Sequence, residues 1–262
     1  MLHAFLSRDP LGYIFESPLL EMLLKIFRVP LYRNLILQCL TVVATLNYGG
    51  FNRVQYANMY NRFMVQLRDI FPPTANIPEA YAHGSSEEQA SIRNVALFLT
   101  SFFKVHARIL ESTQENVAFL LLGLQYLINI SYVDDVDVFK VCLDYWNALV
   151  VELFQASNNW DNCAGTANMI ALQMPRIPLG PDSQPLQRPQ LYADTMHKLR
   201  MLLICRMAKP AEVLVVEGEN GNIVRMTMKD DDVPIQSKKM RETLFYSSHL
   251  DHKDPEKQML KK

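Results

Sequence analysis

The sequence has little glycine and almost no net charge. Its 262 residues include 9 glycines, about half the usual share, which argues against a glycine-turned β-sandwich or a dinucleotide-binding Rossmann domain. The 26 basic and 27 acidic side chains leave a net charge of -1. A protein that binds nucleic acid by general electrostatics needs an excess of basic residues, so we expect no direct nucleic-acid binding.

Cysteine pairs and long apolar runs are also missing. The four cysteines are far apart and form no C-x-x-C motif, which favours free thiols in a reducing, intracellular compartment over a disulfide framework. The longest apolar run, residues 117–130, is too short to cross a bilayer about 30 Å thick. It predicts a buried helix and no membrane insertion. The first ten residues lack the pattern of a secretory signal.

What the sequence does contain is enough apolar material for a sizeable core. Hydrophobic residues make up 49% of the chain and charged residues 20%. Apolar residues recur at helical spacing, and prolines and capping residues divide them into helix pairs at about 18–46, 53–111, 115–157 and 191–250. Successive pairs of this size predict an all-α fold, an α-solenoid of HEAT-type helix pairs. The alternative is a compact all-α domain.

Two serine-led segments predict the beginnings of long helices. The segment Ser85-Ser86-Glu87-Glu88 is expected to cap one of them, and Ser112-Thr113-Gln114-Glu115 matches the capping box. In that motif the hydroxyl accepts a backbone N–H and the glutamate reaches back to the cap. Residues 157–190 instead hold five prolines and two glycines, which predicts a disordered excursion outside the core.

One β-hairpin is predicted near the end of the chain. Asn220 and Gly221 lie between two apolar runs, and Asn-Gly favours a tight turn because both central residues take positive φ. A two-residue turn there would place Val215 opposite Met226. A two-stranded ribbon is marginal alone in water, so we expect the hairpin loop, residues 212–232, to dock on other protein surface and to act as a switch.

No motif for catalysis or metal binding stands out. The sequence lacks a phosphate-binding loop, a nucleophile elbow and a zinc-ligand cluster. His249 and His252 flank Asp251 and could bind a metal, although a solvated helix end explains them more simply. We therefore expect no catalytic residue, no metal and no cofactor. An all-α hydrolase or metal enzyme is the least favoured alternative.

Four segments carry a resemblance to a known family. They read NISYVDD at 129–135, VFKVCLDYWN at 138–147, RMAKP at 206–210 and MRETL at 240–244. These strings resemble the exportins, the nuclear export receptors of the karyopherin-β family, in the form found in plants. The resemblance covers nearly the whole chain and implies a central HEAT-repeat segment of such a receptor.

The resemblance implies a transport function without catalysis. Members of this family are rings of HEAT repeats that bind Ran-GTP inside their curve and cargo with leucine-rich nuclear export signals on the outer face. They contact nucleoporins and shuttle between nucleus and cytoplasm through the nuclear pore. The repeats that form the cargo groove are expected to lie outside this chain. The alternative is a diverged HEAT scaffold that has lost transport activity.

The predicted hairpin resembles the long acidic loop of this family. That loop joins the two helices of one repeat, touches Ran, and packs behind the cargo groove when Ran is absent. By this resemblance, the Ran-facing candidates are Glu217, Glu219, Asn220, Asp230 and Asp232. The candidates that dock the loop are Val213, Val215 and Val224. The loop is less acidic than is usual, because Ala211, Gly218 and Met226 occupy positions where the family has acidic residues.

Overall fold

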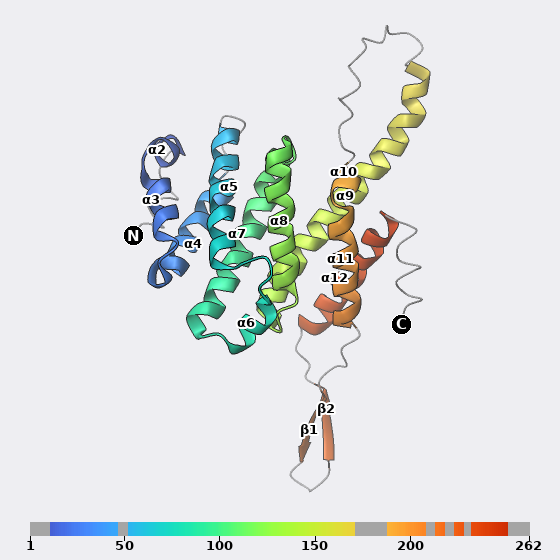
Figure 1. The fold of residues 1–262 in the computed structure, drawn as a ribbon. Helices are drawn as coiled ribbons and strands as arrows, with labels where there is room; N and C mark the ends of the chain where they lie inside the picture. The colour runs from blue at the N-terminus through green and yellow to red at the C-terminus, as the bar shows by residue number, and fades with distance from the viewer. Residues whose placement is uncertain are drawn as a thin grey trace. The chain divides into compact units, whose positions relative to one another are not determined.

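The computed structural model describes residues 11–46, 52–170, 188–207, 213–217, 223–227 and 232–250 (Figure 1). The chain divides into two compact units, residues 1–145 and 146–262, which are described one at a time. The long helix α9 (Val136–Ile170) contributes to both units. Within the described residues the regular structure is helical except for one pair of short strands, in agreement with the expected all-α class.

The first unit is built from helices that pack in two layers. They are α2 (Leu11–Glu16), α3 (Leu19–Ile26), α4 (Pro30–Thr45), α5 (Arg53–Ile70), α6 (Ile77–His83), α7 (Ser86–Leu110) and α8 (Gln114–Ser131). Helix α4 packs on α7, α5 packs on α8, and α7 contacts both α5 and α8. In Figure 1 helices α5 and α8 stand in front of α7, as successive helix pairs of a repeat array do.

Aromatic side chains at helical spacing form the core between α5 and α7. The ring centroids of Phe63 and Phe98 are 4.2 Å apart, and those of Tyr60 and Phe102 are 4.7 Å apart. All four side chains are fully buried. Because residues 98 and 102 are one helical turn apart, they present one continuous aromatic face to α5.

The capping prediction is confirmed for α7 and wrong for α8. The Ser85 hydroxyl accepts the Glu88 N–H at 3.4 Å, and Glu88 Oε2 accepts the Ser85 N–H at 2.7 Å. At α8, however, Thr113 is the cap and accepts the N–H of Asn116 at 3.3 Å. Ser112 still belongs to the turn that closes α7, so its hydroxyl donates to the Ile109 carbonyl at 2.7 Å.

The second unit contains the later part of α9, α10 (Arg188–Leu191), α11 (Ala193–Met207) and α12 (Asp232–His249). Helix α9 continues to Ile170, so the excursion predicted for residues 157–190 is wrong at its beginning. The physical reason is that all five prolines of that stretch lie beyond Ile170, and the residues before them include no strong helix breaker except Gly165. Residues 171–187 lie outside the described residues.

Strands β1 (Val213–Glu217) and β2 (Ile223–Thr227) pair antiparallel in the segment between α11 and α12. The predicted register is wrong by one residue: Val215 pairs with Arg225, and Met226 pairs with Leu214. Five residues, 218–222, separate the two strands. A two-residue turn centred on Asn220 and Gly221 would require a different pairing, because loop length sets the register of a hairpin.

Candidate functional site

The structure describes part of the predicted Ran-facing site. Glu217 ends β1 and pairs across the ladder with Ile223, and Asp232 begins α12. The other Ran-facing candidates, Glu219, Asn220 and Asp230, lie outside the described residues.

The three residues predicted to dock the loop all lie in strands. Val213 and Val215 belong to β1, and Val224 belongs to β2, where it pairs with Val216. The pairing of β1 with β2 therefore brings docking candidates from both strands of the loop together. The surface on which the loop docks stays a prediction.

The two helices that flank this strand pair are tied to each other by a buried side chain. Arg200 of α11 is 1% exposed and donates from Nη1 to the carbonyl oxygen of Ser247 in α12 at 2.9 Å. Thr243 of α12 is also buried, and its hydroxyl accepts a hydrogen bond from Asn147 Nδ2 of α9 at 3.1 Å. A charged group this deeply buried requires hydrogen bonds, and the bond to Ser247 supplies one of them while it joins α11 to α12.

Asp135, just before α9, forms a polar cluster with Tyr81 and Arg93 that the sequence pattern did not reveal. Asp135 Oδ1 accepts the Val138 N–H at 3.0 Å, the hydrogen bond of a helix N-cap. Its Oδ2 accepts the Tyr81 hydroxyl at 2.6 Å and lies 3.7 Å from Arg93. Burial alone would raise the pKa of Asp135, but the hydrogen bonds from Tyr81 and Val138 and the charge of Arg93 together lower it. The cluster fastens α6 and α7 to the beginning of α9.

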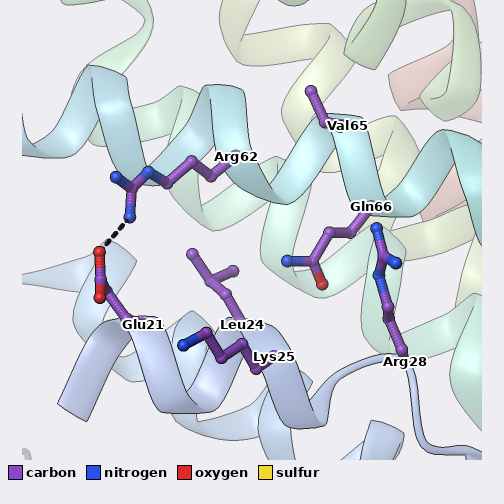
Figure 2. A pocket seen from close by; sticks show the side chains of 7 residues that line it. All are labelled: Glu21, Leu24, Lys25, Arg28, Arg62, Val65 and Gln66. Atoms are coloured by element: carbon purple, nitrogen blue, oxygen red, sulfur yellow. Dashed lines mark hydrogen bonds and ion pairs between the residues drawn. The ribbon is translucent and has the colours of Figure 1, made fainter. Parts of the chain in front are cut away.

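A polar groove lies between α3 and α5 in the first unit (Figure 2). Two ion pairs cross it: Arg62 Nη1 lies 2.8 Å from Glu21 Oε1, and Arg28 Nη2 lies 2.9 Å from Asp69 Oδ2. The hydrogen bond from Arg62, and then its charge, lower the pKa of Glu21. These partners are 41 residues apart in the chain, so sequence reasoning could not pair them.

No helix in the described part of the chain combines the length and apolar character that a membrane span requires. Among those same residues, no three or more histidine, cysteine, aspartate or glutamate side chains are grouped as metal ligands would be. Cys39 and Cys142 are buried free thiols and Cys205 is an exposed one.

Comparison with known proteins finds two families of repeats that match parts of the chain. Residues 188–255 match the family described as CRM1 / Exportin repeat 2. Residues 118–154 match the chromosome region maintenance or exportin repeat. The first match contains α11, the strand pair and α12, and the second contains most of α8 and the beginning of α9.

Similarity to individual proteins extends over the full chain. The chain is 65% identical over 263 residues to Protein EXPORTIN 1A of Arabidopsis thaliana. It is 62% identical over 264 residues to Protein EXPORTIN 1B of the same organism, and both matches cover 100% of the chain. It is 39% identical over 256 residues, 97% of the chain, to Exportin-1 of Drosophila melanogaster. The chain spans about a quarter of the length of these relatives (24%, 24% and 23%). The resemblance to the exportin 1 family, in its plant form, is therefore confirmed along the whole chain.

Proposed function

We propose that this chain serves as the Ran-responsive HEAT-repeat part of a nuclear export receptor. The observation that supports this most strongly is its 65% identity, over its full length, to a plant exportin 1. The whole receptor would bind cargo with leucine-rich nuclear export signals together with Ran-GTP. It would pass the nuclear pore by contact with nucleoporins and shuttle between nucleus and cytoplasm. Catalysis, cofactors, nucleic acid and membrane insertion have no part in this function.

The hairpin loop, residues 212–232, is the proposed contact with Ran. It holds six acidic and two basic residues, so it attracts a basic protein surface and steers the encounter with it. Its position in the chain between α11 and α12 supports this role, because a segment inserted between paired helices can move without unfolding them. The proposed Ran-facing residues are Glu217, Glu219, Asn220, Asp230 and Asp232. The proposed docking residues are Val213, Val215 and Val224.

A pull-down with the purified chain tests this proposal. The immobilised chain is incubated with equal concentrations of Ran loaded with GDP or with a non-hydrolysable GTP analogue, and the retained Ran is quantified. We expect the GTP form to be retained preferentially. Replacing Glu217→Gln, Glu219→Gln and Asp230→Asn should reduce that retention about fivefold, because it removes three negative charges from the loop.

A matched variant distinguishes the effect of the loop's charges on Ran binding from the effect of the protein's total charge. Glu87→Gln, Glu115→Gln and Glu242→Gln remove the same charge from exposed positions on α7, α8 and α12, and should leave Ran retention unchanged. Equal retention of both nucleotide forms, or an equal loss in the two triple variants, would contradict the proposal. Failure to retain Ran at all would favour the alternative, a HEAT scaffold that has lost transport activity.

A further inference from the structure

The groove between α3 and α5 has the dimensions of a small binding site. Its volume is about 450 Å³, and its walls come from Glu21, Leu24, Lys25, Arg28, Arg62, Val65 and Gln66 (Figure 2). A second hollow of about 460 Å³ extends toward α2 and shares Glu21 and Arg62 with the first. The Glu21–Arg62 ion pair therefore lies between two halves of one longer groove.

The floor of the groove is aliphatic. Leu24 is 2% exposed and closes the bottom from α3, while Val65 on α5 is 38% exposed and accessible from solvent. Figure 2 shows Leu24 in the space between the two helices, and Val65 on α5 also lines the groove. An aliphatic side chain from a partner would bury its apolar surface against these two residues.

Gln66 presents an unused hydrogen-bond acceptor in the same groove. Its Oε1 atom is buried and has no hydrogen-bond partner, although the residue lines the groove together with Leu24 and Val65. Buried polar atoms nearly always form hydrogen bonds in folded proteins, because an unsatisfied one lowers the stability of the fold. Rotation about the last side-chain torsion of Gln66, which has broad preferences, would turn this oxygen toward a ligand that brings an N–H group, such as the backbone of a peptide.

The charges that line the groove favour a negatively charged ligand. Arg62 is paired with Glu21 and Arg28 with Asp69, whereas Lys25 forms no ion pair in the described part of the chain and is exposed. The groove region thus has one cation in excess. A single excess cation suits an isolated carboxylate, while the two carboxylates nearby would repel the continuous phosphates of a nucleic acid.

We propose that the α3–α5 groove binds an acidic peptide segment of a partner protein. An aliphatic side chain of the peptide packs on Leu24 and Val65, a backbone N–H donates to Gln66 Oε1, and a carboxylate pairs with Lys25. The exposed Glu21–Arg62 pair contributes little to stability. A second carboxylate can therefore capture Arg62 and join the two hollows into one groove for an extended peptide. This inference does not depend on Ran or on the hairpin loop.

Fluorescence anisotropy with two probe peptides tests the proposal on the full 262-residue chain. The first probe is a labelled six-residue peptide of alternating aspartate and leucine, and the second has lysine in place of aspartate. We expect the aspartate probe to bind at least about tenfold more tightly at low salt. Lys25→Glu should weaken its binding about tenfold, and Gln66→Leu about threefold, because the leucine cannot accept the peptide N–H.

Lys104→Glu is the matched control, because it makes the same charge change at an exposed position of α7 that does not line the groove. It should leave the affinity for the aspartate probe within about twofold of the parent value. Thermal unfolding of each variant verifies that it is folded. Equal weakening by Lys25→Glu and Lys104→Glu, equal binding of the two probes, or no binding of the aspartate probe would each overturn the proposal.

Discussion

At the scale of single residues, Gly123 shows how closely the first unit is packed. A Cβ atom added at this position of α8 would lie 2.0 Å from the Tyr60 hydroxyl oxygen and 2.9 Å from Phe103 Cζ. The Tyr60 hydroxyl is held by the Phe119 carbonyl at 3.1 Å, and the tyrosine is fully buried. Here glycine is required by the close approach of a neighbouring side chain, since the residue lies within a regular helix.

We expect Gly123→Ala to destabilise the protein by about 1–3 kcal/mol, because the methyl group overfills a packed interior. Urea unfolding measures the change in the free energy of unfolding. In a Tyr60→Phe background the same substitution should cost less, since the hydroxyl nearest to the new methyl group is gone. An equal cost in both backgrounds would show that Tyr60 is not the source of the clash.

A second residue-scale prediction concerns pH. His106 is buried against Tyr56, with ring centroids 3.9 Å apart, and burial lowers its pKa from 6.5 to about 4. Between these values the unfolded chain binds more protons than the folded protein. Stability therefore rises with pH through this window and is lost as the pH falls. The full shift corresponds to about 3 kcal/mol.

Urea unfolding at pH 7 and pH 4.5 tests this prediction against His106→Phe. Phenylalanine keeps an aromatic ring beside Tyr56 but cannot take up a proton. Acidic side chains titrate in both proteins, so the informative quantity is the difference between them. The parent should lose about 2–3 kcal/mol more than the variant on acidification. Equal losses would rule out His106 as the source.

At the scale of elements, the beginning of α8 depends on one residue. The sequence pattern fits a cap at Ser112, but the structure has the cap at Thr113, whose φ and ψ of -134° and 149° are extended. Both residues carry a hydroxyl, so composition alone does not discriminate between them. The decision comes from where α7 ends, because Ser112 is still hydrogen-bonded to its last turn.

We therefore expect Thr113→Ala to lower the free energy of unfolding by about 1 kcal/mol, and Ser112→Ala by less than half of that. Both hydroxyls are on exposed residues, so the pair is matched for burial. Chemical denaturation compares them directly. A larger loss for Ser112→Ala would show that the helix begins one residue earlier.

The end of helix α9 is a second feature of an element that the sequence pattern located incorrectly. Its predicted end near residue 157 followed from a change in composition averaged over 157–190. The residues that break helices are concentrated in the later half of that stretch, and the helix continues to Ile170. A helix ends where a specific residue cannot continue it, so an averaged composition locates the end poorly.

At the scale of the whole molecule, the near-zero net charge is the sum of locally different surfaces. The loop at 212–232 is acidic, whereas the groove between α3 and α5 has one cation in excess. Arg200, although it belongs to a basic stretch of α11, is buried and hydrogen-bonded to Ser247. Its charge therefore lies inside the fold and adds little to the exposed surface. These local charges are compatible with the proposed partners, which are Ran-GTP for the loop, by its resemblance to the exportins, and an acidic peptide for the groove.

The sequence by itself determined the helical class, the cap at the beginning of α7 and the resemblance to the exportins. These features depend on neighbours a few residues apart or on long identical strings. Only the tertiary structure decided the register of the strand pair, the length of α9, the need for glycine at 123 and the groove between α3 and α5. Each of these depends on contacts between residues distant in sequence, or on a one-residue choice between locally equivalent groups, which short-range patterns do not encode.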